Sequence, residues 1–155
     1  MTKQKLIVMD IDGVFADSYA WQLKYFTNGK MDEEGYHENI ADFPVNEWLL
    51  RLVNSYVFGG RHILFLSGRP LRYLRETIDW FSSNEKLTMF DVKSEHNCTL
   101  VLKPNISQSH SAWKVSVLKV LETKYDIEIC FDDSPHNIKA FRKAGYKAVQ
   151  MENLY

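Results

Sequence analysis

The amino-acid sequence predicts an α/β protein in which one parallel β-sheet lies between two layers of helices. Short, continuous apolar segments, each closed by a polar residue, alternate along the chain with segments whose apolar residues recur at helical spacing. Neither an internal repeat nor a low-complexity linker interrupts this alternation. With 155 residues, 45% of them hydrophobic, the chain can bury one ordinary core, so we expect a single domain over residues 1–155.

The first predicted strand runs from Lys5 to Asp10. Its apolar residues are continuous rather than alternating, which is typical of a strand buried on both faces of a parallel sheet. Asp12 and Gly13 follow directly, and the glycine allows the backbone to turn sharply. Carboxylates at this spacing can supply a nucleophile and a second acid to one substrate, but an Asp-Gly pair is just as often a plain turn.

Residues 15–43 show no sustained helical face, and we expect them to form an irregular flap. They include a turn signal at Asn28-Gly29. An excursion beside the first strand is well placed to cover a crevice at the end of that strand. Aromatic residues in the flap are candidates for stacking on a nucleobase, and these are Tyr19, Trp21, Tyr25 and Phe26.

A helix is predicted from Pro44 to the glycine pair at Gly59-Gly60. Its apolar residues recur on one face, and we place Trp48 on that buried face as a packing residue rather than as a platform for a base.

The second predicted strand, from His62 to Leu66, leads straight into Ser67, Gly68 and Arg69 at the start of a helical pattern. A hydroxyl group and the free N–H groups of a glycine turn at a helix start suit a phosphate oxygen. Ser67, Gly68 and Arg69 are therefore candidate substrate-binding residues. The alternative is a simple strand-to-helix turn.

The helix that follows has an apolar stripe from Leu71 to Phe81, beside which Trp80 is expected to pack. Basic residues gather around this motif and could steer a polyanion toward it, or they could simply be solvated. They are Arg61, His62, Arg69, Arg72 and Arg75.

Lys114 lies near the start of a predicted helix over residues 111–125, where its charge could reach the same crevice, although most helix lysines are only solvated. The strand from Glu128 to Asp132 ends in Asp132 and Asp133. Two adjacent carboxylates facing Asp10 and Asp12 would repel one another unless a divalent cation or raised pKa values accompanied them. Oxygen ligands of this kind favour Mg²⁺.

The sequence also predicts where the helix after the second acidic pair begins and ends. Asp133 or Ser134 could cap the helix that follows, and that helix is predicted to end at Gly145.

Taken together, the motifs Asp10-x-Asp12-Gly13-Val14, Ser67, Lys114 and Asp132-Asp133 resemble the four motifs of the haloacid dehalogenase-like phosphatase superfamily. The stretch from Ser67 to Arg69, followed by Arg75-x-Thr77-x-x-Trp80, is similar to the 3′-phosphatase domain of bacteriophage polynucleotide kinase and its small phage relatives. The resemblance implies a Rossmann-like three-layer α/β/α fold with a small flap and no large cap, which would leave the crevice open to bulky substrates.

The resemblance also implies roles for these residues. Asp10 would attack phosphorus to give an aspartyl-phosphate, and Asp12 would act as general acid and then base, with a pKa raised toward the working pH. Ser67 and Lys114 would hold phosphate oxygens. Mg²⁺ would be bound by the residues at the strand ends, namely Asp10, Asp12 through its backbone carbonyl, Asp132 and Asp133, the last through water or as an orienting group.

The expected function is a Mg²⁺-dependent phosphomonoester hydrolase that acts on nucleic-acid 3′-phosphate ends or on nucleotides. The alternatives are a 5′-nucleotidase, a small-metabolite phosphatase, or a non-catalytic module that carries a phospho-aspartate. The sequence contains no G-x-x-x-x-G-K-[ST] loop, so any kinase or ligase partner is expected to be a separate polypeptide. The motifs do not indicate an oligomeric state.

A formal net charge of −1 argues against a uniformly basic nucleic-acid-binding surface. Cys98 and Cys130 lie in apolar segments without metal-ligand spacing, so we expect buried free thiols. No signal peptide or membrane-spanning stretch is evident, which favours the cytoplasm, or the host cytoplasm for a phage-encoded protein.

Overall fold

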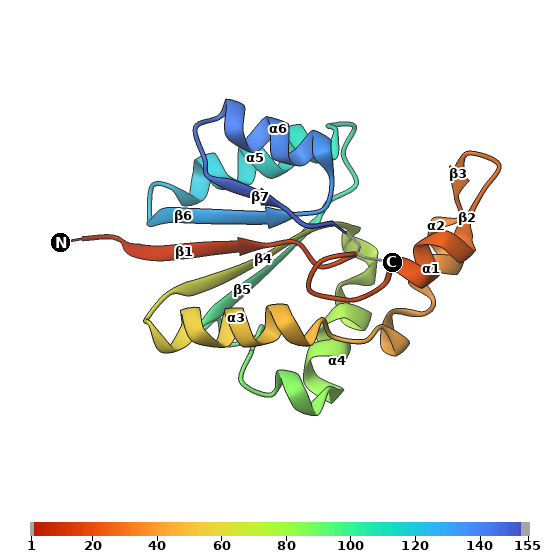
Figure 1. Cartoon of the computed structure of the whole chain (residues 1–155), viewed down its shortest axis with the longest axis horizontal. Coiled ribbons are helices and arrows are strands. Elements are labelled where there is room, and N and C mark those ends of the chain that lie inside the picture. The colour runs from red at the N-terminus through yellow and green to blue at the C-terminus, as the bar shows by residue number, and fades with distance from the viewer. Residues whose placement is uncertain (1, 153–155) are drawn as a thin grey trace.

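The computed structural model describes residues 2–152, and a five-stranded parallel sheet forms its centre (Figure 1). The strand order is β5-β4-β1-β6-β7. The strands are β1 (Gln4–Met9), β4 (His62–Pro70), β5 (Cys98–Lys103), β6 (Tyr125–Asp132) and β7 (Ala148–Gln150). From β1 the chain builds one side of the sheet and then returns to build the other, so the strand order reverses beside β1.

Helices cover both faces of the sheet, which confirms the predicted three-layer α/β fold (Figure 1). On one face lie α3 (Glu47–Phe58) and α4 (Leu74–Ser83), and on the other lie α5 (His110–Leu121) and α6 (Pro135–Lys143). Two short 3₁₀ helices, Leu71–Tyr73 and Glu85–Leu87, flank α4.

Strand β1 shows why its apolar run is continuous. Successive side chains of a strand point to opposite faces, and here Ile7 and Met9 enter the core beneath α3 and α4. Leu6 and Val8 enter the core beneath α5 and α6. Both faces are therefore buried, as the sequence predicts.

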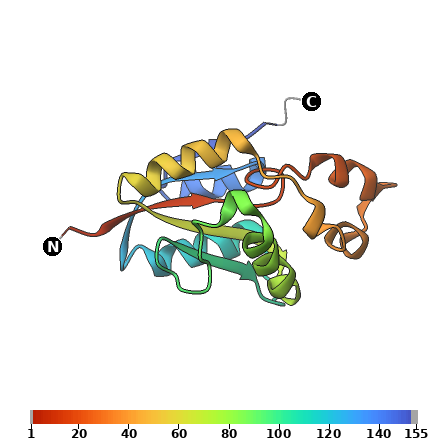
Figure 2. The same cartoon turned by 90° about the horizontal axis from the view of Figure 1, so that it is seen from below.

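The flap lies at the carboxyl end of the sheet and protrudes from it (Figures 1 and 2). It consists of α1 (Tyr19–Tyr25), a hairpin of β2 (Phe26–Thr27) and β3 (Lys30–Met31), α2 (Glu33–His37) and a 3₁₀ helix (Ile40–Asp42). Asn28 and Gly29 turn the hairpin with φ of 52° and 75°. The predicted position is confirmed, but the expected absence of helix is wrong.

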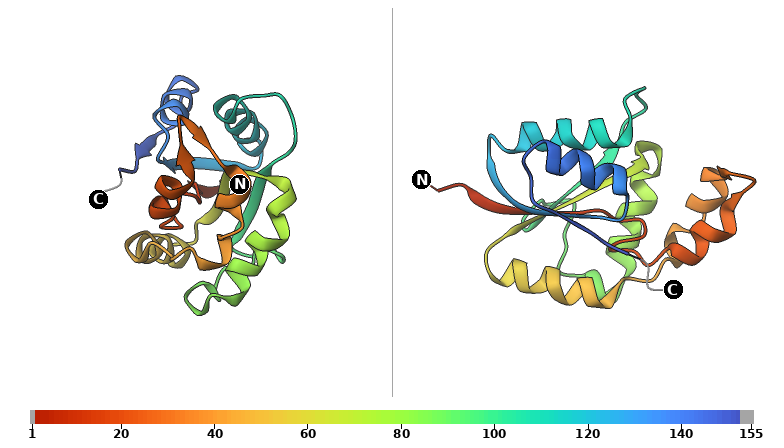
Figure 3. Two further views of the ribbon diagram at one scale, coloured as in Figure 1. Left: turned by 90° about the vertical axis from the view of Figure 1, so that its right-hand side faces the viewer. Right: turned by 45° about the horizontal axis from the view of Figure 1, so that its top comes forward.

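The sequence pattern did not predict the two flap helices because they are too short to show a repeated apolar stripe. Helix α1 has seven residues and buries none of them, whereas α2 has five and starts at an Asp32 side chain that accepts a hydrogen bond from the Gly35 N–H. The right-hand panel of Figure 3 shows this region standing beside the sheet rather than over one of its faces.

Two further details differ from the prediction. Trp48 is 62% exposed rather than buried, while Trp80 is buried and its Nε1–H donates to the Phe43 carbonyl, as expected of a packing residue. Helix α5 ends at Leu121, and Tyr125 already pairs with Gln4 of β1 as the first residue of β6. Both cysteines are buried free thiols, as predicted.

Ser134 is the N-cap of α6, where its hydroxyl accepts from the Asn137 N–H, and Gly145 follows the helix with φ of 93°. No helix within residues 2–152 is long and apolar enough to cross a lipid bilayer.

Candidate active site

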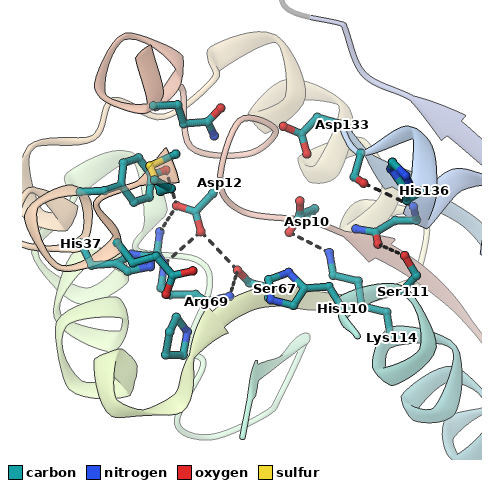
Figure 4. Close-up of a pocket in the computed structure, with 18 residues that line it drawn as sticks. Asp10, Asp12, His37, Ser67, Arg69, His110, Ser111, Lys114, Asp133 and His136 are labelled. Atoms are coloured by element: carbon teal, nitrogen blue, oxygen red, sulfur yellow. Dashed lines mark hydrogen bonds and ion pairs between the residues drawn. The ribbon is translucent and has the colours of Figure 1, made fainter. Parts of the chain in front are cut away.

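A cavity of about 340 Å³ lies at the carboxyl end of the sheet, between β1, β4, β6 and the flap (Figure 4). Asp10 directly follows β1, Ser67 lies in β4, and Lys114 lies in the first turns of α5. These three side chains line the cavity together with Asp12 and Asp133. The structure thus brings together most of the residues that the sequence selected, at the point where the strand order reverses.

Lys114 is the cation at the centre of this cavity. Its side chain is 2% exposed, and Nζ lies 3.0 Å from Asp10 Oδ1 and 2.6 Å from Asp132 Oδ2. Burial opposes the charged ammonium, but the two carboxylates outweigh burial and raise the pKa of Lys114. It is therefore not the solvated helix lysine that the sequence left open.

The three carboxylates of Asp10, Asp132 and Asp133 carry more negative charge than Lys114 neutralises. Burial raises the pKa of Asp10 well above its usual value, against the pull of Lys114, and the neighbouring acids add to the rise. Burial and the charge of Asp132 raise the pKa of Asp133 to about 6.

These three residues fit a divalent cation. Each offers a carboxylate oxygen, and the three oxygens lie within 4.8 Å of one another. Hard oxygen donors are the ligands that Mg²⁺ prefers, and a bound cation would remove the cause of the raised pKa values.

Asp132 is held in place by α6. Its carboxylate accepts from the Ser134 N–H at 2.9 Å and from the Asn137 side-chain amide at 3.0 and 3.1 Å. Ser111 of α5 in turn donates to Asn137 at 2.8 Å. Sequence reasoning missed Asn137, because an asparagine inside a helix gives no local signal of this contact.

The carboxylate of Asp12 points away from the acidic group and toward Arg69 and the flap (Figure 4). Arg69 donates from Nη2 to Oδ1 at 2.7 Å and from Nε to Oδ2 at 3.1 Å, a bidentate pair. The hydroxyl of Tyr36 lies 2.9 Å from the same Oδ1 and 2.7 Å from Ser18 Oγ. Only the backbone of Asp12 is left for the cation site that the sequence predicted.

The expected rise in the pKa of Asp12 is wrong for this structure. Burial acts in the expected direction, but the charge and hydrogen bonds of Arg69 outweigh it and hold the pKa of Asp12 below its usual value. Arg69 was predicted to bind substrate. It lines the cavity, but its side chain is fully buried, and Nη1 donates to Thr77 at 2.8 Å while the rest of the guanidinium holds Asp12.

Ser67 is buried next to this pair. Its hydroxyl donates to Asp12 Oδ2 at 3.3 Å and accepts from the Arg69 N–H at 3.1 Å. Gly68 borders the cavity so closely to His110 that a Cβ there would lie 2.6 Å from the imidazole Nδ1. Only glycine leaves room for this imidazole.

The predicted basic cluster around the second motif does not form one surface. Arg61 lies at the amino end of β4, where it pairs with Glu128 at 3.1 Å, and His62 is buried against Thr99. Arg69 is buried with Asp12, so only Arg72 and Arg75 remain on the outside.

The aromatic residues of the flap differ in their contacts and exposure. Trp21 packs on Phe43 with ring centroids 5.3 Å apart, and the hydroxyl of Tyr25 accepts from Asn39. Phe26 is exposed and stands opposite Met31, which lines the cavity.

The parallel sheet and the order of these groups along it agree with the resemblance to the haloacid dehalogenase-like phosphatases. Solved structures share the fold: a chain of the Pnkp1/Rnl/Hen1 RNA repair complex is 18% identical with a TM-score of 0.67, covering 96% of this chain and 42% of that one. The class C acid phosphatase from Bacillus anthracis with tungstate bound is 17% identical with a TM-score of 0.72, covering 99% of this chain and 68% of that one. The chain spans less than half of the chains that it matches in the structures of the Pnkp1/Rnl/Hen1 complex.

Within this class the family is also shown. The family model described as "Polynucleotide kinase PNKP phosphatase domain" matches residues 4–153, which is nearly the whole chain. The chain belongs to that family of phosphatase domains. The resemblance seen in the sequence motifs is confirmed. A comparison with curated proteins gave no significant match.

Proposed function

We propose that this protein is a Mg²⁺-dependent phosphatase that removes the phosphate from nucleic-acid 3′ ends or from nucleotides, with Asp10 as nucleophile. The observation that carries the proposal is the group formed by the buried Asp10, Asp132 and Lys114 and the half-buried Asp133, beside Ser67. It combines a carboxylate, a cation for phosphate oxygens and three oxygen donors for a metal in one cavity. Bound Mg²⁺ would neutralise charge on Asp10 and on the phosphate.

In the first step, a carboxylate oxygen of Asp10 attacks phosphorus while the bond to the leaving oxygen breaks. Asp12 gives its proton to that leaving oxygen. In the second step, water attacks the aspartyl-phosphate, Asp12 takes a proton from the water, and phosphate and free Asp10 result. Ser67 and Lys114 hold the non-bridging phosphate oxygens through both steps.

Arg69 and Tyr36 position Asp12 for this exchange. The Arg69 pair favours the ionised carboxylate, which is the form that accepts a proton in the second step. The negative charge of an arriving phosphate raises the pKa of Asp12 and so favours the protonated form needed in the first step.

The family match supports a polynucleotide as substrate, since its description names a polynucleotide kinase. The Pnkp1 structure comes from a complex described as an RNA repair complex, which also supports nucleic-acid ends. An exposed Phe26 at the flap agrees equally with a nucleotide, whose base it could stack on.

The test is phosphate release with Mg²⁺ or with EDTA from a 3′-phosphorylated oligonucleotide, a 5′-phosphorylated one, nucleoside monophosphates and p-nitrophenyl phosphate. Asp10→Asn provides the blank, and Asp126→Asn, an exposed acid at the start of β6, is the matched control. We expect Mg²⁺-dependent release that is lost only in Asp10→Asn, with the 3′ end preferred. Preference for monomers would make the protein a nucleotidase, and stable phosphate on Asp10 without release would contradict phosphatase action.

A further inference from the structure

A second cavity, of about 620 Å³, opens directly from the catalytic one. The two cavities share four lining residues, Glu33, Gly68, Pro70 and His110. The His110 ring lies beside Ser67 in Figure 4 and packs against Gly68, so it stands at the passage between the two cavities. Whatever is attached to the reacting phosphate therefore has a continuous path into the second cavity.

Two cations line this second cavity, and they come from neighbouring elements. Lys103 closes β5 and is in register with Pro70 of β4, so the two backbones lie about 5 Å apart. Arg72 follows in the 3₁₀ helix after β4. Both residues are thus built next to Ser67, at the carboxyl ends of adjacent strands.

Neither cation is neutralised by an ion pair. Within residues 2–152, no carboxylate lies within 4.0 Å of the nitrogen atoms of Lys103 or Arg72. Lys103 donates to the Ile106 carbonyl at 3.0 Å, and Arg72 lies over the Tyr73 ring at 5.0 Å. Glu33 is the only acid in the lining. Burial, with the charges of Lys103 and Lys114, lowers the pKa of His110, so the imidazole at the passage is neutral at pH 7.

We propose that this second cavity binds the nucleotide next to the 3′-terminal one in a single-stranded polynucleotide, with Arg72 and Lys103 on its phosphodiester. The inference rests on the proposed phosphatase function and names a further subsite for it. Two unpaired cations suit a phosphate better than a neutral base. The adjacent apolar surface of Leu71 and Pro104 can cover the sugar.

This subsite predicts a difference between polymers and monomers, because a mononucleotide has no second phosphate. The experiment compares kcat/KM for a 3′-phosphorylated DNA pentanucleotide, its RNA counterpart and a nucleoside 3′-monophosphate. The variants are Arg72→Ala, Lys103→Ala and the double variant. Arg75→Ala is the matched control, because Arg75 is also exposed and lies three residues after Arg72, but it does not line the cavity.

We expect each single variant to lower the polymer-to-monomer ratio of kcat/KM about tenfold, chiefly through KM, because each loses one charged contact. The slope of log kcat/KM against log salt for the pentanucleotide should fall by about 0.7 per cation removed. Arg75→Ala should leave both quantities unchanged.

An unchanged ratio in the double variant would overturn the subsite. So would an equal loss on monomer and polymer, which would mean that the two cations serve the reaction centre or the fold. Failure of the proposed function looks different, since the wild-type protein would then release no phosphate from any of these substrates. In that case, anisotropy of a fluorescent 3′-hydroxyl pentanucleotide on wild-type and double-variant protein still tests the subsite, and equal binding would refute it.

Discussion

Replacing Lys114 with methionine removes the cation that pairs with the two buried acids Asp10 and Asp132, and the cost can be worked out from the structure. Lys114 contacts Asp10 and Asp132 at 3.0 and 2.6 Å with its side chain 2% exposed. Removing one partner of a buried ion pair costs about 3–5 kcal/mol, because it leaves an uncompensated charge. For a chain of this size each kcal/mol shifts Tm by about 2–4 °C, so we expect a fall of about 6–20 °C in EDTA.

The assay is thermal unfolding followed by circular dichroism, in EDTA and in Mg²⁺. Lys119→Met is the matched control, because Lys119 lies on the same helix with its side chain 51% exposed and should change stability by less than about 0.5 kcal/mol. Mg²⁺ should reduce the fall in Tm caused by Lys114→Met, since it supplies positive charge to the same carboxylates. The electrostatic account of this site is refuted if Lys114→Met lowers Tm in EDTA no more than Lys119→Met does. It is also refuted if Mg²⁺ does not reduce the difference in Tm between Lys114→Met and the wild-type protein.

Three further predictions follow from single features of the structure. Gly13→Ala should weaken the binding of Mg²⁺ measured by calorimetry, because the new Cβ would lie 2.5 Å from Asp133 Oδ2. Gly29→Ala is the control, since Gly29 has the same φ near 75° but no atom within 4 Å of that Cβ position, and it should leave the affinity unchanged. Equal affinities in the two variants would contradict the contact at Gly13. In EDTA, the carboxyl of Asp133 has a pKa of about 6 in the folded state and of about 4 in the unfolded state. The folded state therefore holds this proton more tightly, so the free energy of unfolding should fall as the pH rises from about 4 to about 6. Urea titrations should show a weaker pH dependence in Asp133→Asn, and an identical dependence would show that the group does not titrate there. Trp80→Ala should lower the free energy of unfolding by about 3–5 kcal/mol and Trp48→Ala by less than about 0.5 kcal/mol, and similar urea midpoints for the two would contradict the assigned burial.

The strand ends were predictable because the signal is local. A strand buried on both faces must be apolar throughout, so the first polar residue after it marks the edge of the sheet. That rule selected Asp10, Ser67 and Asp132, and the structure brings their strands side by side as β1, β4 and β6. Their proposed roles remain predictions until phosphate release is measured.

Helix α3 shows where periodicity fails. The sequence allows an apolar stripe that includes Trp48, but the residues actually buried are Leu49, Leu50 and Val53. The buried face thus includes Leu50 in place of Trp48, so the helix is rotated about its axis relative to the predicted face. The sheet it packs on decides that rotation, and no pattern within the helix contains this information.

The contact between the flap and Asp12 was not predictable for a related reason. Tyr36 reaches Asp12 across 24 residues of sequence, and α2, which carries it, has only five residues. Its hydroxyl is buried between Asp12 and Ser18, where burial and the charge of Asp12 raise the pKa of Tyr36, so it stays protonated. A tyrosine in an irregular acidic stretch gives no sign of this in sequence alone.

Asp12 shows most clearly what the sequence does not predict. The direction of its pKa shift depends on two opposing effects, which are burial and the charge and hydrogen bonds of Arg69. Taking a carboxylate out of water raises its pKa, and this is all that a motif inside a crevice can indicate. Arg69 lies 57 residues away in sequence and reverses the result by donating at 2.7 and 3.1 Å. Because Thr77 holds the other end of the guanidinium at 2.8 Å, Arg69 cannot leave Asp12 without leaving a buried charge unpaired. In the proposed mechanism, Asp12 would therefore have to acquire the proton that it donates in the first step as the negatively charged substrate arrives, which would couple catalysis by Asp12 to phosphate binding.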